Sequence, residues 1–104
     1  MELNLPEKRY YSIGELAKAF KVNTSLIRFW EKEFKILNPH KTDTGIRKFS
    51  QEDVTNLKFI YYLVKERGYT LEGAKIHIKE RQQKDLTKYE IISKLTHRKP
   101  QSLK

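Results

Sequence analysis

The segment from Asn23 to Phe49 restricts the possible folds of this chain more than any other. Within residues 24–34, apolar side chains recur with the spacing of an amphipathic α-helix. Turn-forming Asn, Pro, Asp and Gly residues then separate two short arms, residues 36–37 and 46–49. The sequence therefore predicts a helix that runs directly into a short, cationic β-hairpin.

The predicted helix over residues 24–34 has two faces of different character. Its apolar face carries Leu26, Ile27, Trp30 and Phe34. Its opposite face carries Ser25, Arg28, Phe29 and Lys32. We expect Trp30 in the core and Phe29 at the surface. An exposed aromatic ring beside an arginine suggests a functional role.

Another helix is expected just before this one. Ser12 and Glu15 form the capping-box pattern at its start. Residues 21–23 make a tight connection, and Asn23 or Thr24 caps the following helix. The inward-facing residues of the earlier helix are Ile13, Leu16, Ala17 and Phe20.

Two more helices are expected after the hairpin. Ser50 begins the third helix, Asp53 completes its cap, and Gly68 fits the C′ position that ends it. Thr70 caps a fourth helix. The apolar stripe of the third helix is expected to be Val54, Leu57, Ile60, Tyr61 and Val64.

These elements predict four parts in the chain. Residues 1–9 form a flexible lead-in, and residues 10–81 form one mainly helical domain with the hairpin inserted. Residues 82–96 form a short dimerisation helix. Residues 97–104 are a basic tail that we expect to be disordered.

Charge narrows the choice of partner. The chain has 104 residues and a formal net charge of +9, which favours a polyanion: nucleic acid first, an anionic membrane surface second. There is no cysteine, and therefore no disulfide and no thiolate metal site. No signal peptide and no apolar run of membrane-spanning length is seen, so we expect a cytoplasmic, nucleoid-associated protein.

Catalytic chemistry has little support in the sequence. His40, His77 and His97 are scattered, and we interpret His40 as a turn residue or phosphate contact. Glu31 and Glu33 point to different faces of their helix and form no carboxylate pair. We expect no enzyme activity, no cofactor and no metal.

Duplex DNA fits the basic helix and hairpin better. An α-helix fits the major groove, where Ser25, Arg28 and Phe29 would face base edges or phosphates, with Lys32 one turn further along. Lys41, Arg47 and Lys48 would contact flanking phosphates. The same residues also have structural explanations without DNA binding, which remain open. The helix face could be an ordinary solvated surface, Phe29 could pack under the hairpin, and the cations could keep the hairpin soluble.

Five blocks of the sequence resemble the DNA-binding domain of MerR-type transcriptional regulators. They are Tyr11–Ala17, Leu26–Glu31, Gly45–Phe49, Asp53–Leu57 and Gly68–Leu71, and they occur in the family's order within residues 10–80. The resemblance implies a mainly α, winged helix-turn-helix fold with a hairpin wing, a following helix pair and a dimerising helix. It also implies a homodimer on a palindromic promoter, with RNA polymerase as a further partner.

By position, the resemblance assigns DNA contacts to residues at the first helix start, on the second helix and on the wing. Many relatives have tyrosine at the position of Phe29, and tyrosine or histidine at the position of Ile46. No effector pocket is recognisable in the sequence. We expect a sequence-specific regulator, with an excisionase-like architectural factor or a protein-interaction module as alternatives. The predicted contacts are Tyr11, Ser12, Thr24, Ser25, Arg28, Phe29, Lys32, Lys41, Arg47 and Lys48.

Overall fold

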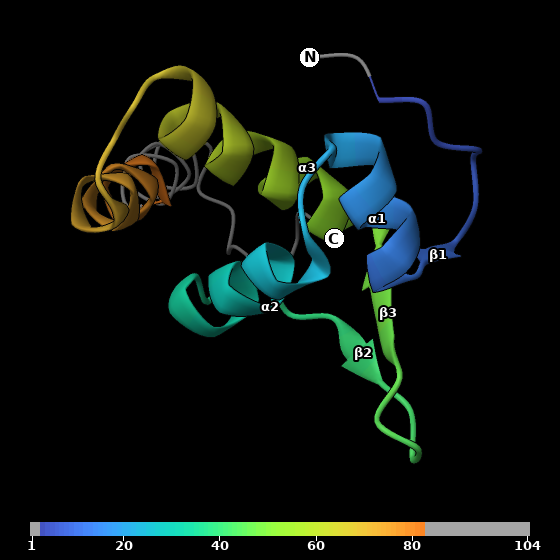
Figure 1. The fold of residues 1–104 in the computed structure, drawn as a ribbon. Helices are drawn as coiled ribbons and strands as arrows, with labels where there is room; N and C mark the ends of the chain where they lie inside the picture. The colour runs from blue at the N-terminus through green and yellow to red at the C-terminus, as the bar shows by residue number, and fades with distance from the viewer. Residues whose placement is uncertain (1–2, 83–104) are drawn as a thin grey trace, which may run out of the picture. The chain divides into compact units, whose positions relative to one another are not determined.

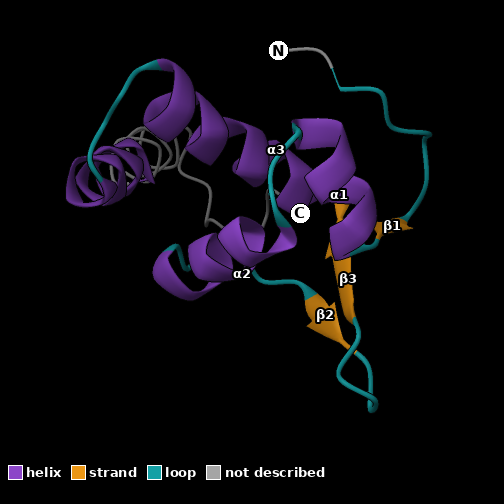
Figure 2. Ribbon diagram, viewed as in Figure 1, coloured by secondary structure: helices purple, strands orange, loops and turns teal. Residues whose placement is uncertain are grey.

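The computed structural model describes residues 3–82, and the chain divides into two compact units, Met1–Gly68 and Tyr69–Lys104. In order, the first unit contains β1 (Tyr10–Tyr11), α1 (Ile13–Phe20), α2 (Thr24–Glu33), β2 (His40–Lys41), β3 (Arg47–Ser50), α3 (Gln51–Tyr61) and the π-helical turn η1 (Tyr62–Glu66), as Figures 1 and 2 show. The described part of the second unit contains a helix over residues 71–82. Apart from Gln82, the predicted dimerisation helix and the basic tail lie outside the described residues.

Helices α1 and α2 form the predicted helix-turn-helix. The capping box is confirmed: Ser12 Oγ accepts from Glu15 N at 3.1 Å, and Glu15 Oε1 accepts from Ser12 N at 2.9 Å. The turn follows from Lys21, which adopts the left-handed backbone conformation with φ 58°. This costs a non-glycine residue about 1 kcal/mol, and the Val22 N–H compensates by bonding Ala17 O at 3.0 Å.

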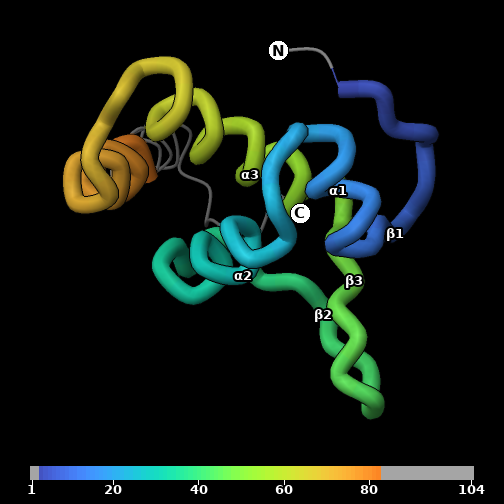
Figure 3. Tube along the Cα trace, viewed as in Figure 1, coloured from blue at the N-terminus to red at the C-terminus, as the bar shows by residue number. Residues whose placement is uncertain are grey.

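The strands form a three-stranded antiparallel sheet with the order β1-β3-β2. Tyr11 pairs with Phe49 at one edge of β3, and Lys41 pairs with Arg47 at the other. In the Cα trace of Figure 3, the β2–β3 hairpin extends beyond α1 and α2. A β-hairpin after α2 is therefore confirmed, with β1 as a third strand.

The predicted position of the first hairpin arm was wrong. Leu37 is not in a strand: it is 3% exposed and its N–H bonds Phe34 O at 3.1 Å. Burial of this side chain next to the end of α2 leaves the strand to begin at His40, after the buried Pro39. His40, which we interpreted as a turn residue, therefore lies in β2.

The third helix begins and ends at the predicted residues, but its last turn is π-helical. The Ser50–Asp53 capping box is present, and Gly68 follows the last cap residue with φ +72°. In between, the π-helical turn adds residues per turn and shifts the apolar stripe. Leu63 is therefore buried at 1% exposure, whereas Val64, predicted for the stripe, is only half-buried.

The core of the first unit lies where α1 packs on α2 and β3, and α3 packs on β3. Phe20 also meets Tyr61, with ring centroids 5.7 Å apart. The largest fully buried side chains are Trp30, Phe20, Phe49, Leu16, Ile27, Leu57, Ile60 and Leu63. In the second unit Ala74 and Ile78 are buried, and Thr70 Oγ1 caps its helix by accepting from Gly73 N at 3.0 Å.

Asp53 ties the hairpin to the helices. Among the described residues it is the one buried charged side chain, at 5% exposure. Its Oδ2 accepts from Ser50 N and Ser50 Oγ, both at 3.0 Å, and its Oδ1 accepts from Asn38 N at 3.0 Å. One carboxylate thus fixes the start of α3, the end of β3 and the chain that leads into β2.

We predict that Asp53→Ala lowers the free energy of unfolding by about 3 kcal/mol, because the change removes charged hydrogen bonds and leaves buried N–H groups without partners. Chemical denaturation measures the loss. The matched control is Glu52→Ala, an exposed acid in the same helical turn, which should cost less than about 1 kcal/mol. Equal losses for the two variants would contradict the role of Asp53.

Candidate nucleic-acid interface

Helix α2 divides between core and surface much as predicted. Ile27 and Trp30 are 0% and 2% exposed, whereas Phe29 is 46% exposed. Arg28 and Lys32 are also exposed, and neither forms an ion pair within residues 3–82. Leu26, Ile27, Trp30 and Phe34 were predicted to face inward together, but Leu26 is only half-buried because it lines a surface groove.

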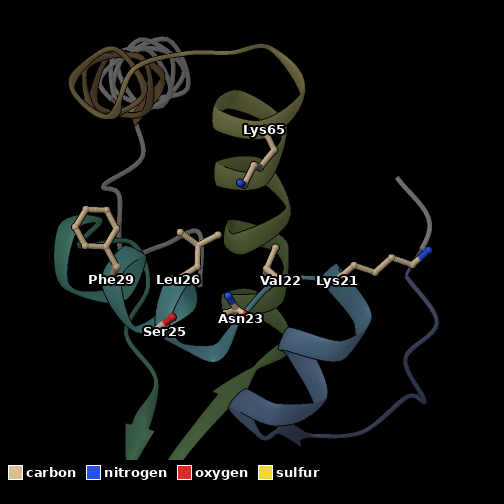
Figure 4. Close-up of a pocket in the computed structure, with 7 residues that line it drawn as sticks. All are labelled: Lys21, Val22, Asn23, Ser25, Leu26, Phe29 and Lys65. Carbon is tan, nitrogen blue, oxygen red and sulfur yellow. The ribbon is translucent and has the colours of Figure 1, made fainter.

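This groove, of about 680 Å³, lies between the start of α2 and the π-helical turn η1. Figure 4 shows Phe29 and Leu26 on one side and Lys65 reaching toward the gap from the other, while Lys21 extends away from it. Phe29 is therefore not packed under the hairpin. The lining residues are Lys21, Val22, Asn23, Ser25, Leu26, Phe29 and Lys65.

Glu31 joins the hairpin to α2. Its Oε1 accepts a charged hydrogen bond from Arg47 Nε, and its Oε2 lies 3.7 Å from Lys41 Nζ. Residues three apart on a helix are neighbours, so Glu31 lies beside Arg28. Arg28 therefore lies one helical turn before Glu31, on the side of α2 where Glu31 contacts the Arg47 guanidinium.

The hairpin cations do not form one cluster. Successive side chains of a strand point to opposite faces, and Arg47 faces Glu31 while Lys48 does not. Lys48 Nζ lies 5.9 Å from the centroid of the Tyr10 ring, and the Arg9 guanidinium lies 5.5 Å from the same centroid. The predicted wing contacts Arg47 and Lys48 are therefore divided between two faces of the sheet.

The residues predicted near the start of α1 differ in accessibility. Tyr11 is 6% exposed, and its hydroxyl donates to Pro6 O at 2.8 Å and accepts from Lys8 N at 3.2 Å. Burial removes Tyr11 from the candidate surface. Ser12 is exposed but engaged as the helix cap, and Thr24, the first residue of α2, is half-buried.

Nearby, an ion pair anchors the lead-in. Lys8 Nζ lies 2.6 Å from Glu15 Oε2. The hydrogen bond from Lys8, followed by the bond from the Ser12 backbone, lowers the pKa of Glu15 below its ordinary value. Gln51 Nε2 also donates to Lys8 O at 3.0 Å. These contacts hold the chain entering β1 against α1 and α3.

The arrangement is suited to binding a polyanion. Lys41 and Arg47 of the hairpin lie against Glu31 of α2. The same helix exposes Arg28 and the aromatic ring of Phe29, which can contact a base methyl or a sugar. Among the described residues, no group of three or more His, Cys, Asp or Glu side chains could hold a metal ion. Over the same residues, no helix has the length and apolar character needed to cross a membrane.

Sequence reasoning missed two residues of this surface, Glu31 and Lys65. In the sequence, Glu31 stands out only as half of a carboxylate pair that does not form, and its partner Arg47 comes 16 residues later. Two cations at the hairpin and one acid on the preceding helix were the available signal. No signal in the sequence points to Lys65, since its place in the groove depends on how α3 and η1 pack.

Comparison with known proteins gives this surface a context. Residues 11–81 match the family model for MerR HTH family regulatory proteins. The HTH-type transcriptional regulator ZntR of Escherichia coli K12 is 36% identical over 63 residues, which is 61% of this chain and 44% of that protein. The chain thus spans less than half the length of this relative.

Two solved structures are similar in fold. A MerR family transcriptional regulator from Bacillus thuringiensis has a TM-score of 0.58 and 25% identity, covering 85% of this chain and 76% of that chain. HiNmlR, a MerR family regulator that lacks the sensor domain and is bound to promoter DNA, has a TM-score of 0.54 and 20% identity, covering 85% and 80%. The predicted winged helix-turn-helix fold is confirmed.

We predict losses of stability of very different size for the two adjacent aromatic residues of α2. Trp30→Ala should lower the free energy of unfolding by about 3–5 kcal/mol, since it empties a core position. Phe29→Ala should cost less than about 1 kcal/mol, because its ring already contacts solvent. Thermal or chemical denaturation of the two variants tests this. A large loss for Phe29→Ala would mean that the ring serves packing instead of an exposed surface.

Proposed function

This chain belongs to the MerR family of helix-turn-helix regulatory proteins, and on this premise we propose that it is a transcriptional regulator that binds specific double-stranded DNA. The observation that carries the proposal is the contact of Glu31 with Arg47, which brings the wing alongside the exposed face of α2. A helix and a neighbouring wing on one side can engage a groove and its flanking backbone together. Such a protein would act in the cytoplasm.

In the proposed complex α2 enters the major groove. Ser25 lies at its N-terminal end and Arg28 follows one turn later, where an arginine can bond O6 and N7 of a guanine or clamp a phosphate. Phe29 faces the groove that also holds Lys65. We assign this groove to the DNA backbone, with Phe29 against the sugars and Lys65 beside the phosphates.

The wing would contact the neighbouring backbone. The Glu31 contact uses Nε of Arg47, which is one of five donors on a guanidinium, so the terminal nitrogens remain to donate to phosphate. Lys41 is 55% exposed and retains access to solvent. Lys48 would reach DNA only from the other face of the sheet, and its contribution is correspondingly secondary.

We further propose that two copies bind a palindromic site, because a single helix-turn-helix reads only one half-site and dimer symmetry is mirrored in the DNA. The similarity to a relative without a sensor domain that binds promoter DNA favours a regulator over an architectural recombination factor. RNA polymerase would then be the further partner.

We expect Arg28→Ala and Arg47→Ala to weaken DNA binding in different ways. Arg28→Ala should lose about tenfold in affinity for the selected site and relax base preference at one position. Arg47→Ala should weaken binding to every sequence, most strongly to the selected site, and lower the salt slope of log K by about 1. Isotherms over a range of salt concentrations measure both. Lys79→Ala removes an exposed charge of the second unit and is the matched control. If both arginine variants bind like this control, the proposed interface is wrong.

Selection of bound duplexes from a random pool tests specificity and symmetry together. We predict enrichment of an inverted repeat whose half-sites are separated by about one or more helical turns, 10 to 10.5 base pairs each. Bending of the selected duplex, measured beside promoter activity, would separate regulation from architecture. An unenriched pool would reject sequence-specific binding, and enrichment of a single half-site would reject the dimer.

A further inference from the structure

Glu31 places a negative charge inside a surface that otherwise attracts phosphate. It lies near the C-terminus of α2, where the helix dipole disfavours an acid. Its side chain is 14% exposed, and that of Arg47 is 25% exposed, so solvent screens their contact only in part. A carboxylate held at an unfavourable position of a DNA-facing helix requires a specific benefit.

The sheet register shows what this benefit is. Lys41 and Arg47 are direct cross-strand partners, and like charges directly opposite each other destabilise a strand pair. Glu31 contacts both of them, with one oxygen on each. The carboxylate therefore offsets the repulsion within the hairpin and fixes the guanidinium of Arg47 by its Nε.

We infer that Glu31 is a positioning residue that sets the preference of this protein for its own site over arbitrary DNA. This inference rests on the proposed DNA-binding function. By holding Arg47 and Lys41, Glu31 fixes the geometry in which a matched site receives the wing. By its charge, it reduces the sequence-independent attraction of the same two cations for any phosphate backbone.

The test is the full-length Glu31→Gln variant. The probes are a duplex selected from a random pool by the wild-type protein and a scrambled duplex of equal composition. Glu31→Gln should bind the scrambled duplex more tightly than the wild type, because the wing cations can then neutralise one more phosphate. One additional phosphate neutralised changes the salt slope by about 0.9, so this gain in affinity should fall about threefold between about 50 and about 200 mM salt. The ratio of selected to scrambled affinity should fall about tenfold, as for one lost base-specific contact.

Glu80→Gln is the matched control, since it makes the same charge change at an exposed position of the second unit. A lower affinity ratio for Glu31→Gln than for Glu80→Gln supports the inference. Equal ratios overturn it, because Glu31 would then act only through net charge. Failure of the wild-type protein to bind any duplex would instead reject the proposed function, so the two failures are distinguishable.

A second pair of variants tests whether Glu31→Gln acts only by leaving Lys41 and Arg47 to repel each other and loosen the hairpin. Lys41→Met removes one of the two facing cations and thereby the repulsion. Glu31→Gln combined with Lys41→Met must then show a lower affinity ratio than Lys41→Met alone. In the free protein, the Nε–H resonance of Arg47 must also shift between these two variants. An unchanged resonance together with an unchanged ratio overturns the inference.

Discussion

The buried carboxylate of Asp53 is the interaction on which the position of the wing depends. A β-hairpin of two short strands is marginal by itself in water, and β2 has only two residues. Asp53 fixes both ends of this hairpin to α3, through Asn38 N ahead of β2 and Ser50 at the end of β3. Because α3 packs on β3 and contributes Leu57 and Ile60 to the core, the hairpin inherits the rigidity of the helical body.

Glu31 continues this constraint from the base of the hairpin to its cationic part. Asp53 determines where the hairpin starts and ends, whereas Glu31 determines how close Lys41 and Arg47 lie to α2. The two carboxylates differ in environment: Asp53 is buried with backbone and hydroxyl donors, and Glu31 is partly exposed with cations. The first therefore serves folding, and the second can respond to a phosphate that approaches the same cations.

Local signals made the helices predictable, and long-range contacts set the rest. The pairs Ser12–Glu15 and Ser50–Asp53 are three residues apart, so the sequence shows both capping boxes directly. The start of β2 depends on burial of Leu37, which no local pattern reveals. The apolar period also fails beyond Tyr61, because a π-helical turn changes the number of residues per turn.

The candidate site was predicted in its helix and only in part in its wing. The helical wheel separates Phe29 from Trp30 correctly, since the period of α2 alone decides which ring is buried. It cannot place Arg47 against Glu31, because that contact depends on the hairpin register. Alternation along β3 then divides Arg47 from Lys48, although both looked equivalent as neighbouring cations in the sequence.

The size of this surface argues for two copies on DNA. In one copy, α2 exposes Arg28, Phe29 and Lys32, and a good base contact contributes about 1–3 kcal/mol of discrimination. A few such contacts reach only the lower part of the about 4–10 kcal/mol that separates specific from arbitrary sites. Cations alone do not close this gap, because phosphate contacts strengthen binding to every sequence. In the proposed complex, a second copy on a symmetric half-site would double the base contacts, and an acid that restrains the wing cations would lower the affinity for arbitrary DNA with which those contacts compete.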